Sequence, residues 1–236
     1  MINIAEQTLA SIVTDNSGTV PVLEKYGLDF CCKGKRTLIE ACKEKGLLVD
    51  DIIKEFGTSL PNNSAKQMPF KEMNCEQLIG YILINHHFYV KLIMPTIAGH
   101  LEKVANKHGE RFPNMVEVYQ LFLEVQSEMT SHMQKEEQIL FPRIKKVEEI
   151  IASENTSAIS TIDLDGPITV MMNEHDHAGD LLYKIRNLTN NYQEPVGACT
   201  TFKVVLNELK EFEEDLHKHV HLENFHLFPN AVELAG

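Results

Sequence analysis

One pattern of metal-binding residue types occurs twice in this chain, and this duplication restricts the possible folds more than any other feature. Each copy has an Asn-x-His element, a His-x-x-x-Glu element whose histidine follows 44 or 45 residues later, and a closing Phe-Pro pair. The elements are Asn85–His87, His132–Glu136 and Phe141–Pro142 in the first copy, and Asn173–His175, His219–Glu223 and Phe228–Pro229 in the second. Matched distances of this kind predict a duplicated pair of helices.

The spacing also predicts which side chains meet. Residues four apart lie on one face of a helix, so the histidine and glutamate of each His-x-x-x-Glu element can point to the same side. The Asn-x-His elements supply one further histidine each, from two other helices. The predicted ligands of a two-metal site are His87, His132, Glu136, His175, His219 and Glu223. Imidazole with carboxylate suits iron, so we expect two non-haem iron ions bridged by the two carboxylates, with an oxo or hydroxo bridge lowering the remaining charge.

A purely structural reading is the alternative. A single His-x-x-x-Glu on a helix arises by chance and then usually lies on a solvated face. Two copies with matching upstream histidines and the same Phe-Pro ending favour metal binding instead. Adjacent helical residues point about 100° apart, so only one of His86 and His87 can face the centre. The repeat aligns His87 with His175 and His86 with Glu174, so we predict that His87 is the ligand and that His86 and Glu174 lie around the site or at its entrance.

The other histidines are not predicted to be ligands. His226 lies nearly on the face of His219, but its counterpart in the first copy is Ile139, which indicates a packing position. His177 and His221 lie two residues from predicted ligands, hence on another face, and we expect both to be exposed to solvent.

The wider pattern predicts an all-α protein. From residue 74 onward, helical periodicity indicates long helices over about 74–107, 114–147 and 165–190, and a fourth that reaches about 232. Long helices with shorter connections are typical of an up-down-up-down four-helix bundle, in whose core metal sites are built. We expect a small helical domain over 1–58, a linker over 59–72 and the bundle over 73–236.

Composition excludes several classes of function. A net charge of −12 argues against nucleic acid as a partner, because phosphate binding requires clustered Lys and Arg. The longest apolar runs are too short for a membrane span, and no secretion signal follows Met1. Five cysteines are not a secreted disulfide framework, which predicts reduced thiols and a cytoplasmic location. We expect Cys42, Cys75 and Cys199 to be structural.

The adjacent pair Cys31-Cys32 has two readings. Free cysteines pack well as small buried apolar residues. Alternatively, the turn around Gly34, the nearby cations Lys33, Lys35 and Arg36, and a helix start at Thr37 would lower a thiol pKa and give a reactive thiolate. The residues alone leave both readings open.

At this point the chain resembles the family of di-iron proteins for repair of iron centres. The resemblance is carried by residues 24–27, 29–32 and 34–38 for the family's N-terminal domain, and by 131–142, 174–176 and 219–229 for its hemerythrin-like domain. It implies a di-iron centre on the six residues above, and Cys31 and Cys32 as the family's N-terminal thiols. It also implies restoration of iron–sulfur clusters damaged by nitric oxide or oxidants, with damaged iron–sulfur proteins as partners. The differences lie elsewhere, His177 and His226 among them.

Three functions are compatible with such a site. The first is cluster repair, with iron donation or nitric oxide handling at the metals and the thiols as a relay. The second is enzymatic reduction of nitric oxide or peroxide. The third is an oxygen carrier or sensor of hemerythrin type. The symmetric two-plus-two histidine set and the cysteine-bearing domain favour the first or the second over the third.

Overall fold

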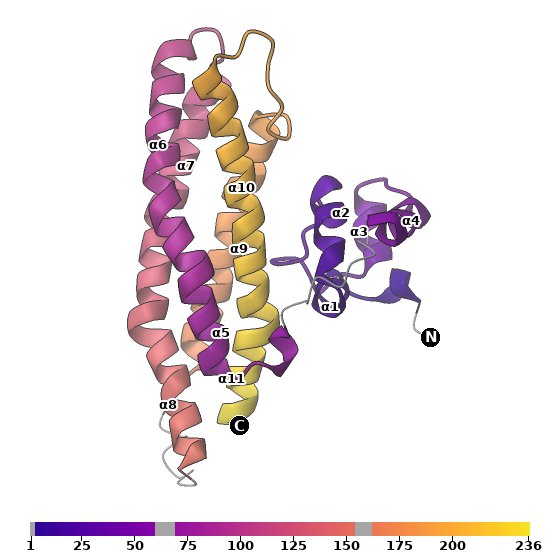
Figure 1. Ribbon diagram of the computed structural model, residues 1–236, viewed down its shortest axis with the longest axis vertical. Coiled ribbons are helices and arrows are strands. Elements are labelled where there is room, and N and C mark those ends of the chain that lie inside the picture. The colour runs from indigo at the N-terminus through magenta and orange to yellow at the C-terminus, as the bar shows by residue number, and fades with distance from the viewer. Residues whose placement is uncertain (1–2, 60–68, 154–161) are drawn as a thin grey trace.

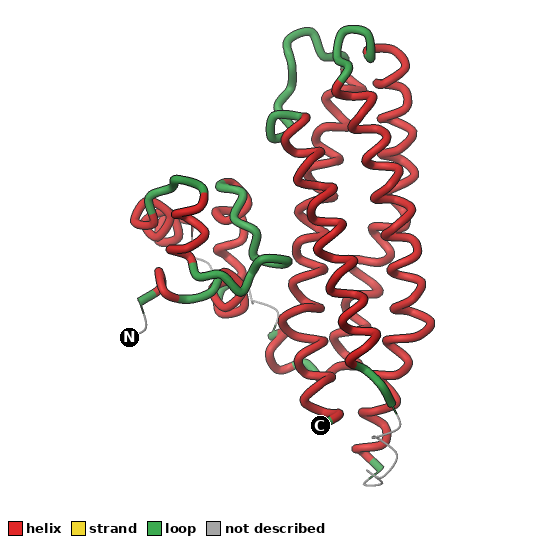
Figure 2. The backbone as a smooth tube through the Cα atoms, turned by 180° about the vertical axis from the view of Figure 1, so that it is seen from behind, coloured by secondary structure: helices red, strands yellow, loops and turns green. Residues whose placement is uncertain are grey.

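The computed structural model describes residues 3–59, 69–153 and 162–236. Helices make up the regular structure of these ranges, and no strand occurs within them (Figure 2). The predicted all-α class is therefore confirmed. Residues 60–68 of the predicted linker lie outside the described residues. Among the helices described, none is both long and apolar enough to cross a membrane.

The N-terminal part forms a unit of short helices. Their bounds are α1 Leu9–Asp15, α2 Val20–Lys25, α3 Leu38–Glu44 and α4 Val49–Ser59. Thr37 caps α3 as its sequence position predicts, because its side chain accepts from the backbone N–H of Glu40 while the Glu40 carboxylate accepts from the backbone N–H of Thr37. Gly27 follows α2 with a φ of 60°, in the left-handed region that glycine adopts without strain.

Four long helical rods form the second part, and Figure 1 shows them side by side in alternating directions. Their segments are α5 Cys75–Ile82, α6 Phe88–His108, α7 Asn114–Lys135, α8 Phe141–Ala152, α9 Asp165–Leu188, α10 Thr200–Leu222 and α11 Phe228–Ala235. Asn74 caps the first rod together with Gln77. The helix α7 packs against α6 and α9, and α6 packs against α10. This is the predicted four-helix bundle.

Three of the rods contain one wide turn of π-helix, which the periodicity did not predict. These turns are Leu83–His87, Glu136–Leu140 and Glu223–Leu227. In the last two, the backbone N–H of Phe141 or Phe228 donates to the carbonyl of the glutamate five residues earlier. The next residue in each case is the proline of the Phe-Pro pair. Proline has no N–H and interrupts the hydrogen-bond ladder at this point, so the repeated pair marks a break in the helix beside each glutamate.

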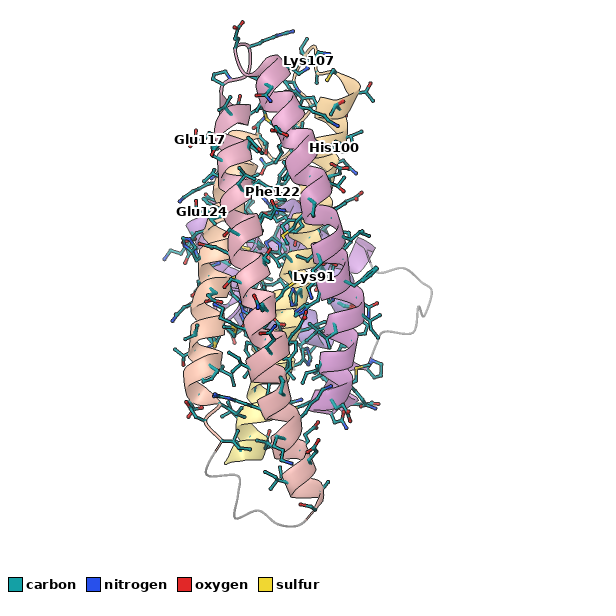
Figure 3. The ribbon with its side chains drawn as sticks, turned by 90° about the vertical axis from the view of Figure 1, so that its left-hand side faces the viewer. Lys91, His100, Lys107, Glu117, Phe122 and Glu124 are labelled. Atoms are coloured by element: carbon teal, nitrogen blue, oxygen red, sulfur yellow. The ribbon has the colours of Figure 1, made fainter. Side chains whose placement is uncertain are left out.

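The bundle core has two apolar regions. One includes Val90, Phe122 and Met133 and continues into the N-terminal unit, and the other includes Ile82, Leu140 and Phe228. Figure 3 shows Phe122 pointing into the bundle and Glu124 pointing away from it. Along each rod, the predicted ligands come where the chain passes from one apolar region to the other. They form a polar layer between the two regions.

The N-terminal unit lies against the bundle (Figure 1), and a buried ionic network joins the two. Arg186 of α9 donates to Glu213 of α10 at 2.8 Å and to Glu24 of α2 at 3.1 Å. The other Glu24 oxygen lies 2.6 Å from Nδ1 of His217. Burial raises the pKa of Glu24, but the charges of His217 and Arg186 outweigh burial and hold the pKa below its usual value. Glu24 is therefore an ionised link between the two parts.

Candidate metal centre

The structure brings together all six residues that the repeat predicts as ligands. They come from all four rods, and each is at most 1% exposed. His87 ends the first wide turn, and each of the two glutamates begins one of the others. The other three histidines lie in regular α-helix: His132 in α7, His175 in α9 and His219 in α10. The full set is His87, His132, Glu136, His175, His219 and Glu223.

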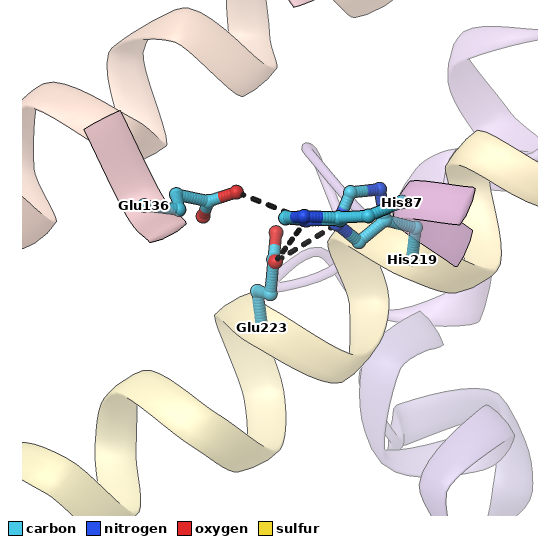
Figure 4. A group of neighbouring side chains, drawn as sticks. All are labelled: His87, Glu136, His219 and Glu223. Carbon is cyan, nitrogen blue, oxygen red and sulfur yellow. Dashed lines mark hydrogen bonds and ion pairs between the residues drawn. The ribbon is translucent and has the colours of Figure 1, made fainter. Parts of the chain in front are cut away.

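Two overlapping clusters result. His87 and His219 form one cluster with both glutamates, and His132 and His175 form the other with the same two glutamates. In each cluster the possible ligand atoms lie within 4.8 Å of one another. Figure 4 shows the first cluster, with the Glu136 and Glu223 carboxylates directed at the histidine rings. Because both carboxylates belong to both clusters, they occupy the position of bridging ligands.

The distances are consistent with this arrangement. The Nε2 atoms lie 3.2 Å apart in the His87–His219 pair and 3.1 Å apart in the His132–His175 pair. One oxygen of Glu136 lies 3.3 Å from Nε2 of both His87 and His132. The two oxygens of Glu223 divide between the pairs: one lies 2.8 Å from His219 and the other 3.1 Å from His175.

The site has the unmet polar contacts that cations would satisfy. Among the described residues, both Glu136 oxygens and one Glu223 oxygen are buried without a hydrogen bond. Buried carboxylates are costly unless they are paired or coordinate metals. Each pair of facing Nε2 atoms also turns two nitrogen lone pairs toward one another unless a proton or a metal lies between them. The donor set therefore fits two metal ions.

Neighbouring charges shift the pKa values of groups at this centre. Burial lowers the pKa of His132, but the nearby Glu136 carboxylate and the hydrogen bond to Glu174 outweigh burial and raise it to about 10. Burial raises the pKa of Glu223, but His219 and His175 hold it well below its usual value. Metal ions would displace the His132 proton, because only neutral imidazole and ionised carboxylate coordinate.

A further ring of residues holds the imidazoles by their outer nitrogens. Nδ1 of His87 lies 2.8 Å from a Glu137 oxygen, and Nδ1 of His175 lies 3.0 Å from the side-chain oxygen of Asn224. Such contacts fix the ring orientation and leave Nε2 free to bind metal. Sequence reasoning missed both residues. The signal was present, because Glu137 and Asn224 each follow the glutamate of a His-x-x-x-Glu element and therefore correspond in the repeat.

His132 and His219, the histidines of the two His-x-x-x-Glu elements, do not have matching contacts at their outer nitrogens. Nδ1 of His132 lies 2.9 Å from Glu174, which places Glu174 beside the site as expected. At the corresponding position of the first copy stands His86, whose ring stacks on His219 at 5.5 Å instead of bonding to it. Nδ1 of His86 lies 3.0 Å from Asp215. His86 is outside both clusters, so the structure brings His87 into the centre and not its neighbour.

The remaining histidines agree with the predictions in two cases of three. His177 is exposed, between Glu124 and Glu128 on α7. His226 is buried outside both clusters, with its ring 6.2 Å from that of Phe70. The prediction that His221 is exposed is wrong: it is 4% exposed and lies 3.2 Å from the Thr14 hydroxyl. The N-terminal unit covers the helix face that would otherwise be solvated.

Of the two readings of the cysteine pair, the environment of Cys31 favours the buried, packed thiol. Burial, the neighbouring Cys32 and the carboxylate of Asp29 together raise the pKa of Cys31 well above its usual value. The cations that suggested a reactive thiolate are not among these contacts, and Arg36 forms an ion pair with Glu44 instead. Cys32 lies close to the centre, because its Sγ donates to the backbone carbonyl of His175 at 3.4 Å.

Comparison with known proteins agrees with this geometry. Residues 79–231 match the family described as the hemerythrin HHE cation binding domain, and residues 5–59 match a domain of unknown function, DUF542. The chain is 32% identical over 223 residues to the iron-sulfur cluster repair protein ScdA of Staphylococcus haemolyticus, covering 94% of this chain and 96% of that protein. The chain belongs to the hemerythrin-domain family of iron–sulfur cluster repair proteins.

Other members of this family match over the same length. The iron-sulfur cluster repair protein YtfE of Escherichia coli O1:K1 is 35% identical over 233 residues, covering 98% of both chains. A probable iron-sulfur cluster repair protein of Haemophilus influenzae is 33% identical, covering 98% of this chain and 99% of that protein. The match to a cation-binding family and the two His/Glu clusters both indicate metal binding in the bundle.

Proposed function

We propose that this protein holds two non-haem iron ions in its bundle and repairs iron–sulfur clusters damaged by nitric oxide or oxidants. The names of its relatives support the repair role. The observation that carries the proposal is the pair of His/Glu clusters sharing two buried carboxylates, because both Glu136 oxygens and one Glu223 oxygen lack hydrogen bonds within the described chain. Such a donor set of imidazole and carboxylate suits iron.

In this proposal His87 and His219 bind one ion, His132 and His175 bind the other, and Glu136 and Glu223 bridge them. Bound there, the irons would supply both iron for a damaged cluster and a redox centre for nitric oxide. Burial of all six ligands excludes large substrates from the site. The protein contributes orientation, through the Nδ1 contacts of His87, His132 and His175, and a site shielded from bulk water.

We further propose that Cys31 and Cys32 pass iron between the bundle and a damaged cluster in a partner protein. The contact of Cys32 Sγ with the His175 carbonyl supports a path at this point. A cleft of about 1520 Å³ between the N-terminal unit and the bundle also borders Cys32, and it gives a partner access to this thiol. We place this activity in the cytoplasm, where unpaired thiols stay reduced.

Reduction of nitric oxide or peroxide is the second candidate. The same burial favours it, because a site with ligands at most 1% exposed admits only small molecules. Anaerobic incubation of the reduced protein with nitric oxide separates the two. Nitrous oxide formed in many turnovers would support a reductase, whereas released iron that restores a damaged cluster supports repair.

The repair proposal is tested by iron content and by cluster restoration. We expect close to two irons per chain with paired-iron spectroscopic coupling, which Glu136→Leu or Glu223→Leu should abolish. The double variant Cys31→Ser, Cys32→Ser should keep its iron yet fail to restore a nitric-oxide-treated iron–sulfur protein. Cys199→Ser, at a partly exposed thiol elsewhere, is the matched control. Stoichiometric zinc without iron from iron-rich medium, or repair by the double variant at the normal rate, would contradict the proposal.

A further inference from the structure

A second group of metal-ligating side chains lies in the loop that carries the two thiols. The Sγ of Cys31 lies 3.3 Å from Oδ1 of Asp29 and 3.7 Å from the Sγ of Cys32. The same Asp29 oxygen accepts from the backbone N–H groups of Cys31 at 3.0 Å and Cys32 at 2.9 Å. These two bonds fix the carboxylate in place beside the thiols.

The charges of this loop fit a cation better than a nucleophile. A reactive thiolate is stabilised by nearby positive charge or by a helix N-terminus. Here the side chain next to the buried thiol of Cys31 is instead the Asp29 carboxylate, which opposes a thiolate. Thiolate and carboxylate become compatible when a cation lies between them, and each thiol that coordinates then releases its proton to solvent.

The two separations from the Cys31 sulfur are close to those around a tetrahedral ion, and all three ligand atoms lie within 4.8 Å of one another. Bonds of about 2.3 Å to sulfur and about 2.1 Å to oxygen at tetrahedral angles separate two sulfurs by about 3.8 Å and a sulfur from an oxygen by about 3.6 Å. The observed separations are 3.7 Å and 3.3 Å. We infer that Asp29, Cys31 and Cys32 form a third metal site, for a divalent ion of borderline softness. Only the identification of that ion as Fe²⁺ rests on the proposed function.

This third site adjoins one of the two bundle clusters. Cys32 bonds to the backbone of His175, and the backbone carbonyl of Cys31 accepts from the side chain of Asn224 at 3.3 Å. Asn224 in turn holds Nδ1 of His175. The approach to α9 is close, because a Cβ at Gly179 would lie 3.2 Å from the Cys32 sulfur. The loop therefore receives or delivers metal at the His132–His175 side of the centre.

Cobalt(II) tests this site directly. Iron-loaded full-length protein is reduced with a phosphine, so that no competing thiol is present, and titrated anaerobically with Co²⁺. We expect one further equivalent to bind, with the near-ultraviolet charge-transfer absorption of cobalt–thiolate bonds. Cys31→Ser should remove most of this absorption. Asp29→Asn should keep the thiolate bands but weaken Co²⁺ binding at least about tenfold. Cys199→Ser should change neither.

Two results would overturn the inference. Saturation without charge-transfer absorption would mean that the thiols bind no metal, and equal affinity in Asp29→Asn would remove the carboxylate from the ligand set. Circular dichroism and iron content of each variant show that the fold and the bundle centre are intact. Since Co²⁺ binding does not require cluster repair, failure of the third site is distinguishable from failure of the proposed function.

Discussion

Removing the outer partner of one histidine should weaken one metal position and spare the other. Glu137 accepts from Nδ1 of His87 at 2.8 Å, so Glu137→Ala leaves that ring free to rotate. A hydrogen bond to a charged group contributes about 2 kcal/mol, which corresponds to about 30-fold in affinity. The bond from His175 to the uncharged Asn224 is longer, 3.0 Å, and contributes about 1 kcal/mol. Asn224→Ala should therefore cost about fivefold.

Iron release to a chelator measures this difference. The iron-loaded protein is mixed with an excess of a coloured ferrous chelator, and absorbance is followed until both irons have been removed. We expect two phases of one iron each. Glu137→Ala should accelerate only the phase of the His87–His219 position, and Asn224→Ala only the phase of the His132–His175 position.

The control is Asn207→Ala, which removes an exposed hydrogen bond to Glu211 on α10, far along the chain from Asn224. This variant should release iron as the unaltered protein does. The reasoning is refuted if Glu137→Ala and Asn224→Ala accelerate the same phase, or if neither changes release. Either result would mean that the Nδ1 contacts do not fix the two metal positions separately.

Three further outcomes are expected. His87→Ala should lose iron while His86→Ala keeps it, and the reverse result would reassign the ligand. Arg186→Ala leaves the buried Glu24 without its partner on α9 and should lower the free energy of unfolding by about 3 kcal/mol in urea titration; no change would show that the network does not secure the N-terminal unit. Because the pKa of Glu24 is lowered, its stabilisation is full above about pH 4.5 and is lost as the pH falls through its folded-state pKa. Glu24→Gln should flatten this acid dependence of thermal unfolding, and an unchanged profile would exclude Glu24 as its source.

The convergence of the six buried residues could be predicted because it depends on helical geometry alone. A four-residue spacing fixes a common face, and duplication supplies the partner helices. The wide turns could not be predicted in the same way, because apolar periodicity does not separate a bond to the fourth residue from one to the fifth. Two of the three left a trace in the sequence, the pairs Phe141–Pro142 and Phe228–Pro229, which were read only as repeat markers.

The prediction that His221 is exposed was wrong, and the reading of Cys31 as a thiolate of lowered pKa is not the one that the structure favours. The burial of His221 depends on how the N-terminal unit packs against the bundle, and the raised pKa of Cys31 depends on its burial and on Cys32 and Asp29 beside it. Thr14 and His221 are more than two hundred positions apart, so no local pattern relates them. Charges near Cys31 in the sequence were likewise a poor guide, because Arg36 turns to Glu44 and leaves Asp29 as the group beside the thiol.

The side chain of Asn224 couples ligand binding at the cysteine loop to metal binding in the bundle. Its amide nitrogen holds the carbonyl of Cys31 and its amide oxygen holds the ring of His175. A ligand that moves the cysteine loop must therefore change the affinity of the His175 position, and filling that position must change the affinity of the loop by the same factor. The loop and the bundle then report each other's occupancy, so delivery of metal by one can be matched to its departure from the other.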